Sequence, residues 1–258
     1  QRIFNQGRDF DQSTYDFFAS GPFSLLGRQH ELVVGASKRQ LKTEATGGHV
    51  FVGVPDINGF SPKGLARPTV PDVYSLSDKV DQEGLYLTTR WNLADPLKVI
   101  LGARLDWYDA ASIYDQTNDQ YYTSGKTKEV RHVTRYAGVI YDLDDNHSAY
   151  ASYTDIFQPQ TEKNGEGAGI KPITGENYEV GIKGEYFGGA LNASASLFQI
   201  DQLNRAAEVA DASVCRVIPA GSYGCYEAAG KVRSQGLELE INGALTPNWQ
   251  VAAGYTFA

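Results

Sequence analysis

Apolar and polar residues alternate along ten stretches of this chain, each about 10 to 15 residues long. A period of two is typical of β-strands whose two faces meet different surroundings. In 98–111 one face carries Val99, Leu101, Ala103, Leu105 and Trp107, and the other carries Gly102, Arg104, Asp106 and Tyr108. The predicted strands are 12–24, 31–43, 81–93, 98–111, 129–143, 147–157, 176–187, 190–202, 232–244 and 248–258.

The connections between these strands alternate in length. Short links with turn-forming residues fall at 26–30, 94–97, 144–146, 188–189 and 246–247, and long segments at 44–80, 112–128, 158–175 and 203–231. A soluble sandwich fits the strand period equally well, but four long loops are rare in a compact soluble domain. Outer-membrane barrels have short periplasmic turns and long external loops. We therefore expect an all-β fold, an antiparallel transmembrane β-barrel.

Aromatic and charged residues agree with a barrel wall. Trp91, Tyr141, Phe187 and Trp249 lie beside short turns, where they are expected to form the periplasmic aromatic girdle, although aromatic residues favour strand ends in any β-protein. The charged residues Arg104, Glu185, Glu238 and Glu240 are expected to face a wet lumen. An arginine or lysine facing lipid at mid-depth would cost about 2–4 kcal/mol.

The composition excludes further classes of protein. No apolar run approaches the roughly 18 residues of a spanning helix, which excludes a helical membrane protein. A net charge of -8 argues against a nucleic-acid partner. The chain starts without Met and stops in an apolar stretch, so we expect a fragment that forms one barrel domain over 1–258, with no second domain.

Motifs for catalysis or metal binding are lacking. His30, His49, His132 and His147 have no metal-ligand spacing, and the glycines of NGEGAGI lie in a predicted loop rather than a phosphate-binding turn. A pair of His132 with Asp109 is conceivable in a barrel with enzymatic activity, but no motif supports it. We therefore expect no enzyme, no metal site and no cofactor.

Four sequence segments resemble those of TonB-dependent ferric-siderophore receptors, most of all the coprogen and pyoverdine receptor group. They are SAYASYTDIFQPQ (148–160), PITGENYEVGIKGEYF (172–187), LNASASLFQIDQLN (191–204) and AAGKVRSQGLELEINGALTPNWQVAAGYTFA (228–258). The similarity is strong in the second half and looser over 1–147. It implies a 22-stranded barrel, of which ten strands are present here, closed by an N-terminal plug that is absent.

The resemblance also implies a function. A receptor in the bacterial outer membrane, surrounded by lipid, would import a ferric siderophore, of a hydroxamate-containing kind, using energy delivered by TonB through a missing N-terminal segment. Two alternatives stay open. One is a TonB-dependent receptor for haem, cobalamin or a glycan; the other is a passive porin or a barrel protease.

Loop residues are the candidates for ligand contact. Tyrosine rings offer flat contact area with a polar tip, and arginines attract oxygen ligands, although any single one of them can simply pack within its own loop. The candidates are Tyr114, Tyr121, Tyr122, Arg131, Arg205, Tyr223 and Tyr226, with Phe51, Phe60, Arg67 and Arg216 in a wider set. Cys215 and Cys225 lie in one long loop and are expected to form a disulfide in the oxidising periplasm. Iron is held by the siderophore itself, so no protein ligand is expected.

Overall fold

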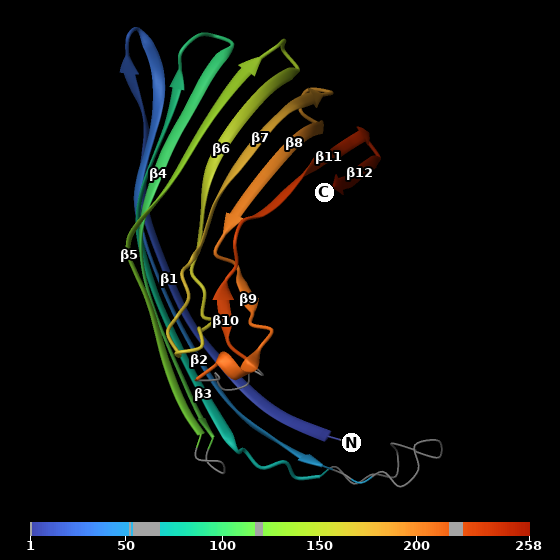
Figure 1. Cartoon of the computed structure of the whole chain (residues 1–258). Coiled ribbons are helices and arrows are strands. Elements are labelled where there is room, and N and C mark those ends of the chain that lie inside the picture. Colours follow the sequence, from blue (N-terminus) through green and yellow to red (C-terminus); the bar gives the residue numbers. More distant parts are fainter. Residues whose placement is uncertain (1, 52, 54–67, 117–120, 217–223) are drawn as a thin grey trace.

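Ten strands form one antiparallel sheet in the computed structural model, which describes residues 2–51, 53, 68–116, 121–216 and 224–258 (Figure 1). The strands of this sheet, in order, are β1 (Arg2–Leu25), β2 (Arg28–Phe51), β3 (Tyr74–Asn92), β4 (Leu97–Gln116), β5 (Tyr121–Asp142), β6 (His147–Gln158), β7 (Ile173–Tyr186), β8 (Leu191–Leu203), β11 (Val232–Thr246) and β12 (Trp249–Phe257). A second small sheet pairs β9 (Ala206–Glu208) with β10 (Tyr226–Ala228), and η2 (Ala212–Val214) is a 3-10 turn. Within the described ranges no helix is long and apolar enough to cross a membrane.

All ten predicted strands are present, but several extend further than predicted. Segments 44–51, 74–80, 112–116 and 121–128 were expected in loops and instead continue the antiparallel ladders. β1 and β2 each have 24 residues, about 79 Å at 3.3 Å per residue, whereas crossing a bilayer takes about 9–11. Beyond the hydrocarbon both faces meet water, so alternation is no longer required there, while backbone hydrogen bonding still favours pairing.

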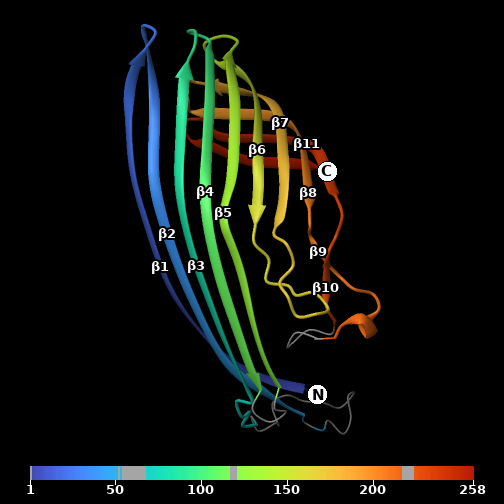
Figure 2. The same ribbon diagram turned by 60° about the vertical axis from the view of Figure 1, so that its left-hand side comes forward.

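The short connections and the long ones lie at opposite ends of the sheet, as Figures 1 and 2 both show. The link between β1 and β2 consists of Leu26 (φ 52°) and Gly27 (φ 75°), and two positive φ angles in succession are typical of the tight hairpin turns that match strand twist. The β7–β8 link likewise has positive φ at Phe187, Gly188 and Gly189. The predicted alternation of short and long connections is therefore confirmed.

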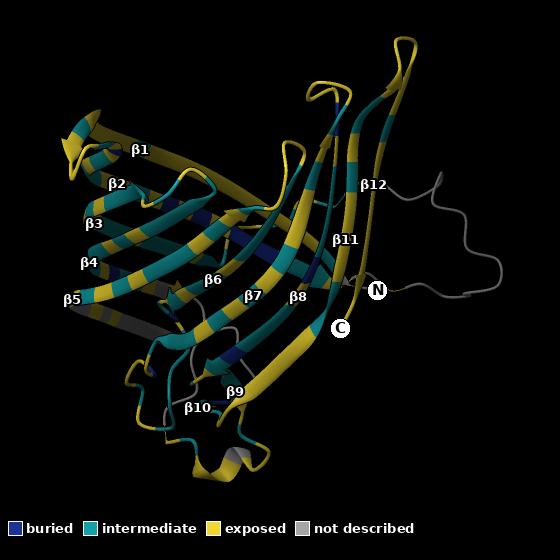
Figure 3. Cartoon of the chain, turned by 90° about the horizontal axis from the view of Figure 1, so that it is seen from above, coloured by how far each residue is buried: buried dark blue, intermediate teal, exposed yellow. Residues whose placement is uncertain are grey.

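Register divides the sheet into an apolar face and a polar face. On the apolar face Leu85 pairs with Leu105, Val180 with Leu197, and Leu197 with Leu237. Of these side chains, Leu85, Val180 and Leu197 stay exposed, at 51%, 54% and 58%. The expected lumen residues Arg104, Glu185, Glu238 and Glu240 occupy the opposite face, and Figure 3 shows exposed and less exposed positions alternating along the strands. An exposed apolar wall opposite a polar one is what lipid outside and water inside require.

Aromatic residues line the short-turn rim of the apolar face. Trp91 lies 5.3 Å from Phe23 and 4.9 Å from His30, measured between ring centroids. His30 is only 3% exposed, and its Nδ1 accepts from the Asn92 amide while its Nε2 lies 3.1 Å from the Leu25 carbonyl. That pattern requires a neutral imidazole with its proton on Nε2. Histidine in this girdle was not expected from the sequence; Phe187, expected in it, lies in the turn itself.

The turn between β5 and β6 yields a pH-dependent prediction. The Asp144 carboxylate accepts hydrogen bonds from the Asn146 and His147 amides and from the His147 ring, and these hold the pKa of Asp144 below its usual 3.8. Because the folded pKa is depressed, the ionised carboxylate stabilises the turn above pH 3.8 and that contribution is lost as the pH falls through the folded value.

We expect the NMR shifts of the Asn146 and His147 amides in detergent micelles to titrate together, with a midpoint below 3.8. The Asp144→Asn protein, which keeps an acceptor but has no charge, is the control and should show no such titration. A midpoint at or above 3.8 would contradict the assignment.

Candidate functional site

The two long connections on either side of β7 and β8 meet in one structure at the loop end, visible in Figures 1 and 2. We call it the outer lobe: residues 159–172, together with the described part of 204–231, which holds β9, η2 and β10. Cys215 and Cys225 are joined by a disulfide within it. Backbone bonds from Tyr226 to Lys163 and from Arg216 to Gly165 tie the two connections together. The sequence showed two separate loops, whereas the structure makes them one body.

Some of the predicted ligand contacts lie in this outer lobe. Arg205 is exposed between β8 and β9, and its carbonyl accepts from the Ala229 amide at 2.7 Å. Tyr226 is half-buried in β10, opposite Glu208. Tyr223, Phe60 and Arg67 lie outside the described residues.

The other predicted contacts lie on the hairpin of β4 and β5. Three of them, Tyr114, Tyr121 and Tyr122, belong to paired strands rather than to a loop, which corrects the expectation for them; only their backbone is described. Phe51, expected in the first long loop, is likewise the last residue of β2. Arg131 lies within the predicted strand 129–143, and the structure makes it the extra residue of a β-bulge opposite Asp106 and Trp107, with φ 62° and an exposed side chain. A bulge turns the strand locally and re-aims its side chains. The structure therefore does not gather all candidates in one place.

The polar face carries a hydrogen-bonded wall along β1 to β5. Tyr86 donates to Asp16 at 2.9 Å, and Arg104 donates to Asp106 and to Ser37, each at 2.8 Å. Tyr136, which bonds Thr88, lies across Gly102, where a Cβ would come within 2.2 Å of its ring. A cavity of about 570 Å³ opens among these side chains. This wall can hold water or a polar solute, as a transport lumen must.

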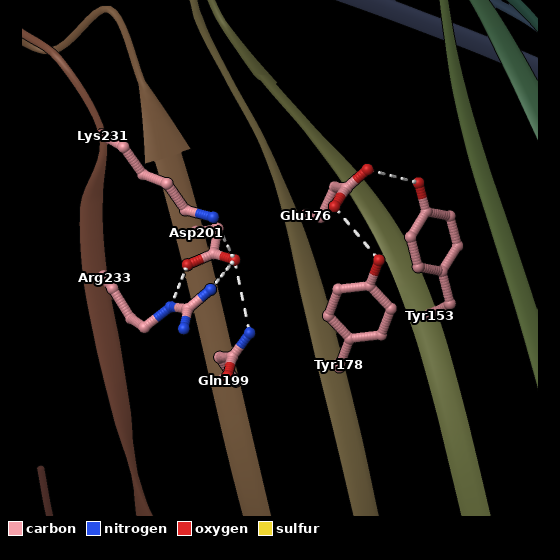
Figure 4. A network of polar contacts seen from close by, with 7 residues as sticks. All are labelled: Tyr153, Glu176, Tyr178, Gln199, Asp201, Lys231 and Arg233. Carbon is pink, nitrogen blue, oxygen red and sulfur yellow. Dashed lines mark hydrogen bonds and ion pairs between the residues drawn. The ribbon is translucent and has the colours of Figure 1, made fainter.

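A ribbon of charges and tyrosines crosses the apolar side of the sheet, nearer the loop end than the exposed leucines and valines. Figure 4 shows the part of this ribbon from Tyr153 to Arg233. Register places Asp155 opposite Glu176, Glu176 opposite Asp201, and Asp201 opposite Arg233. Asp201 accepts two bonds from Arg233, at 2.6 and 2.8 Å, and one from Lys231 at 2.9 Å. Tyr178 donates to Glu176 at 3.0 Å, with Tyr153 nearby, and Arg135 pairs with Asp155 at 2.9 Å.

This ribbon marks where the hydrocarbon ends, because charges on the lipid-facing parity are tolerated near the interface and not at mid-depth. Along β7 every second residue faces this apolar side, and these residues change from Ile182 and Val180 to Tyr178 and Glu176 toward the loop end. The ribbon was missed in the sequence, although that change within single strands was a readable signal.

Neither metal binding nor the His132–Asp109 pair finds support. In the part of the chain that the structure describes, no three His, Cys, Asp or Glu side chains are grouped to hold a metal ion. The His132 ring stacks on Phe157 with centroids 3.8 Å apart, and Asp109 lies 3.7 Å from the Lys128 ammonium. Both side chains are engaged elsewhere.

Comparison with known proteins identifies the relatives of this chain. The family described as "TonB dependent receptor-like, beta-barrel" matches residues 1–258. The chain is 38% identical over 251 residues to the ferripyoverdine receptor of Pseudomonas aeruginosa, covering 95% of this chain and 29% of that receptor. It is 35% identical to the ferric-pyoverdine M114 receptor of Pseudomonas sp. (strain M114), covering 96% and 31%.

A solved structure agrees. The crystal structure of the P. aeruginosa ferripyoverdine receptor bound to ferripyoverdine superposes with a TM-score of 0.81 and 35% identity, over 98% of this chain and 33% of that one. This chain thus spans about 30% of the length of the curated relatives. The chain belongs to the β-barrel family of TonB-dependent receptors, which are proteins of the bacterial outer membrane.

Proposed function

We propose that the full-length receptor binds a hydroxamate-containing ferric siderophore at the loop end of the barrel and imports it with energy delivered through TonB. The observation that carries this proposal is the likeness to ferric-pyoverdine receptors over nearly the whole chain. A ferrioxamine B receptor of Salmonella typhimurium is also similar, at 27% identity over 229 residues. The relatives are receptors and transporters rather than enzymes. We further propose that residues 1–258 belong to one barrel domain, without a second domain.

Recognition would fall to side chains around the mouth. The siderophore supplies the iron ligands, so the protein needs groups that recognise an organic shell with oxygen atoms at its surface. We propose Arg205 and Tyr226 of the outer lobe, together with Arg131 of the β4–β5 hairpin, as contacts. The remaining candidates, which rest on the sequence, are Tyr114, Tyr121, Tyr122 and Tyr223. Guanidinium groups form charge-assisted bonds to such oxygens, and tyrosines add apolar contact area.

Binding and uptake by the full-length receptor test the function. Purified receptor should bind ferric pyoverdine or ferrioxamine B and should ignore haem, cobalamin and oligosaccharides. Cells that express it should take up radioactive iron from the same complexes, and loss of TonB should stop uptake while leaving surface binding intact. Preferential binding of haem, cobalamin or a glycan would replace the siderophore in the proposal. Uptake that persists without TonB would favour a passive pore.

A single substitution tests the site. Removing the exposed guanidinium in Arg205→Ala should weaken binding of the ferric siderophore about ten-fold, since a hydrogen bond to a charged group contributes about 1.5–3 kcal/mol and 1.4 kcal/mol is a factor of ten. Equilibrium titration of the purified receptor gives the affinity. Arg28→Ala, which removes a guanidinium at the short-turn end, is the matched control and should bind normally. Equal affinity of the two proteins would remove Arg205 from the site.

A further inference from the structure

We propose that Gln160 is a positioning residue that locks the two connections of the outer lobe into one rigid body, in which segment 159–172 covers the Cys225 sulfur of the Cys215–Cys225 disulfide. Nothing in the sequence singles out this glutamine. Its consequence for ligand affinity rests on the proposed function; its structural part does not.

The Gln160 amide uses both its donors and its acceptor inside the lobe. Its Nε2 donates to the carbonyls of Lys171 and Asn204, each at 2.6 Å, and its Oε1 accepts from the Ala206 amide at 2.9 Å. The residue is only 6% exposed. One side chain thus joins the two ends of its own loop to the chain on both sides of Arg205. A carboxylate in its place would keep the acceptor and lose both donors.

Segment 159–172 is held together by hydrogen bonds of its own. The Asn164 side chain accepts from the Glu166 and Ala168 amides at 3.0 and 2.9 Å, and Gly167 takes a positive φ of 82° in the turn that follows. Ile170 is buried and its amide bonds the Glu162 carbonyl at 3.1 Å. A segment with internal bonds of this kind moves as a unit, so loss of its anchor would release all of it.

The docked segment covers the disulfide. The Lys163 carbonyl accepts from the Tyr226 amide at 2.9 Å and the Gly165 carbonyl from the Arg216 amide at 2.8 Å, so the segment is bonded beside both cysteines. A Cβ at Gly165 would lie 3.0 Å from the Val214 carbonyl oxygen and 3.4 Å from Cys225 Sγ. Cys225 is 1% exposed, whereas Cys215 is half-buried. The backbone at Gly165 therefore lies directly over the sulfur.

Locking the lobe has a consequence for binding. Gln160 holds the peptide groups on either side of Arg205, which is a proposed ligand contact. A contact fixed in place before binding loses less conformational entropy when the ligand arrives. Among variants of one interface, such differences appear mostly in the dissociation rate.

Disulfide reduction tests the lock without any ligand. Full-length receptor in outer-membrane vesicles is treated with a water-soluble phosphine, and free thiols are counted over time by mass spectrometry. Gln160→Ala and Gln160→Glu should be reduced at least ten-fold faster than the wild type. Gln158→Ala changes an exposed glutamine two residues earlier and should match the wild type. Equal rates in all four proteins would overturn the proposal.

Ligand dissociation tests the positioning role. Gln160→Ala should release ferric pyoverdine several-fold faster with a nearly unchanged association rate, and Gln158→Ala should not. Faster reduction with an unchanged dissociation rate would overturn the positioning role. If the wild type does not bind ferric pyoverdine at all, the proposed function fails, while the reduction rates still decide whether Gln160 locks the lobe.

A second variant guards against misfolding at position 160. Gly165→Ala inserts a methyl group between segment 159–172 and the disulfide, from the other side of the same contact. It should reproduce the faster reduction and the faster release while the barrel assembles normally, as judged by heat-dependent electrophoretic mobility. Slow reduction of this variant, with Gln160→Ala reduced rapidly, would mean that the segment does not cover the sulfur atoms.

Discussion

The Leu239→Arg receptor should fail to assemble in the outer membrane, whereas the Glu240→Arg receptor should assemble. The two positions are neighbours on β11 and receive the same new side chain, but they point to opposite faces. Leu239 lies between Ala195 and Tyr255 on the apolar face, and Glu240 lies between Ser194 and Gly254 on the polar face. An arginine facing lipid at mid-depth costs about 2–4 kcal/mol, while a lumen position exchanges one hydrated charge for another.

Assembly is measured as the amount of heat-modifiable receptor in the outer-membrane fraction of cells expressing the full-length protein. Leu239→Gln, which adds polarity without a charge, should fall between the two arginine variants. Equal assembly of Leu239→Arg and Glu240→Arg would show that the apolar and polar faces have been assigned wrongly. The comparison is sharp because strand, depth and introduced side chain are all matched.

Removing the disulfide should loosen the outer lobe without disturbing the barrel. Chain-entropy models give about 2.5–3 kcal/mol for a bridge that closes a loop of ten residues or so, which is about a 100-fold change in a local opening equilibrium. The amide of Val209, which bonds the Cys225 carbonyl at 2.9 Å, reports that opening. In the Cys215→Ser/Cys225→Ser receptor its hydrogen exchange should accelerate by up to about that factor.

Hydrogen exchange followed by mass spectrometry checks this prediction, and the β7–β8 ladder supplies the internal control because its exchange should not change. The intact wild-type receptor should show no free thiol at Cys215 and Cys225 under non-reducing conditions. Detection of both thiols would contradict the disulfide, and unchanged exchange at Val209 would mean that the lobe is held by its hydrogen bonds alone.

The sequence was informative where one face of a strand meets lipid and the other face meets water. In β4 the alternation of Leu101 and Leu105 with Arg104 and Asp106 predicted the strand, its two faces and its place in a transmembrane wall. The same rule failed at Tyr114 and Tyr121, which continue the β4–β5 ladder beyond the membrane. Both faces of the strands meet water there, so the strands can pair without any alternation of apolar and polar residues in the sequence. The bulge at Arg131 has no such pattern either, because it depends on how β4 and β5 pair.

By itself, then, the sequence determined the strands within the membrane, their apolar side and the alternation of short and long connections. All of these follow from residues close together in the chain. Only the tertiary structure decided that two loops form one lobe, that Gln160 of the first loop bonds Asn204 of the second, 44 residues away, and that charges from β5 to β11 meet in a ribbon. The physical reason is that the alternation of apolar and polar residues in a strand reflects the lipid on one face and the water on the other. Contacts between loops and across strands depend on strand register and tertiary folding, which no local sequence pattern specifies.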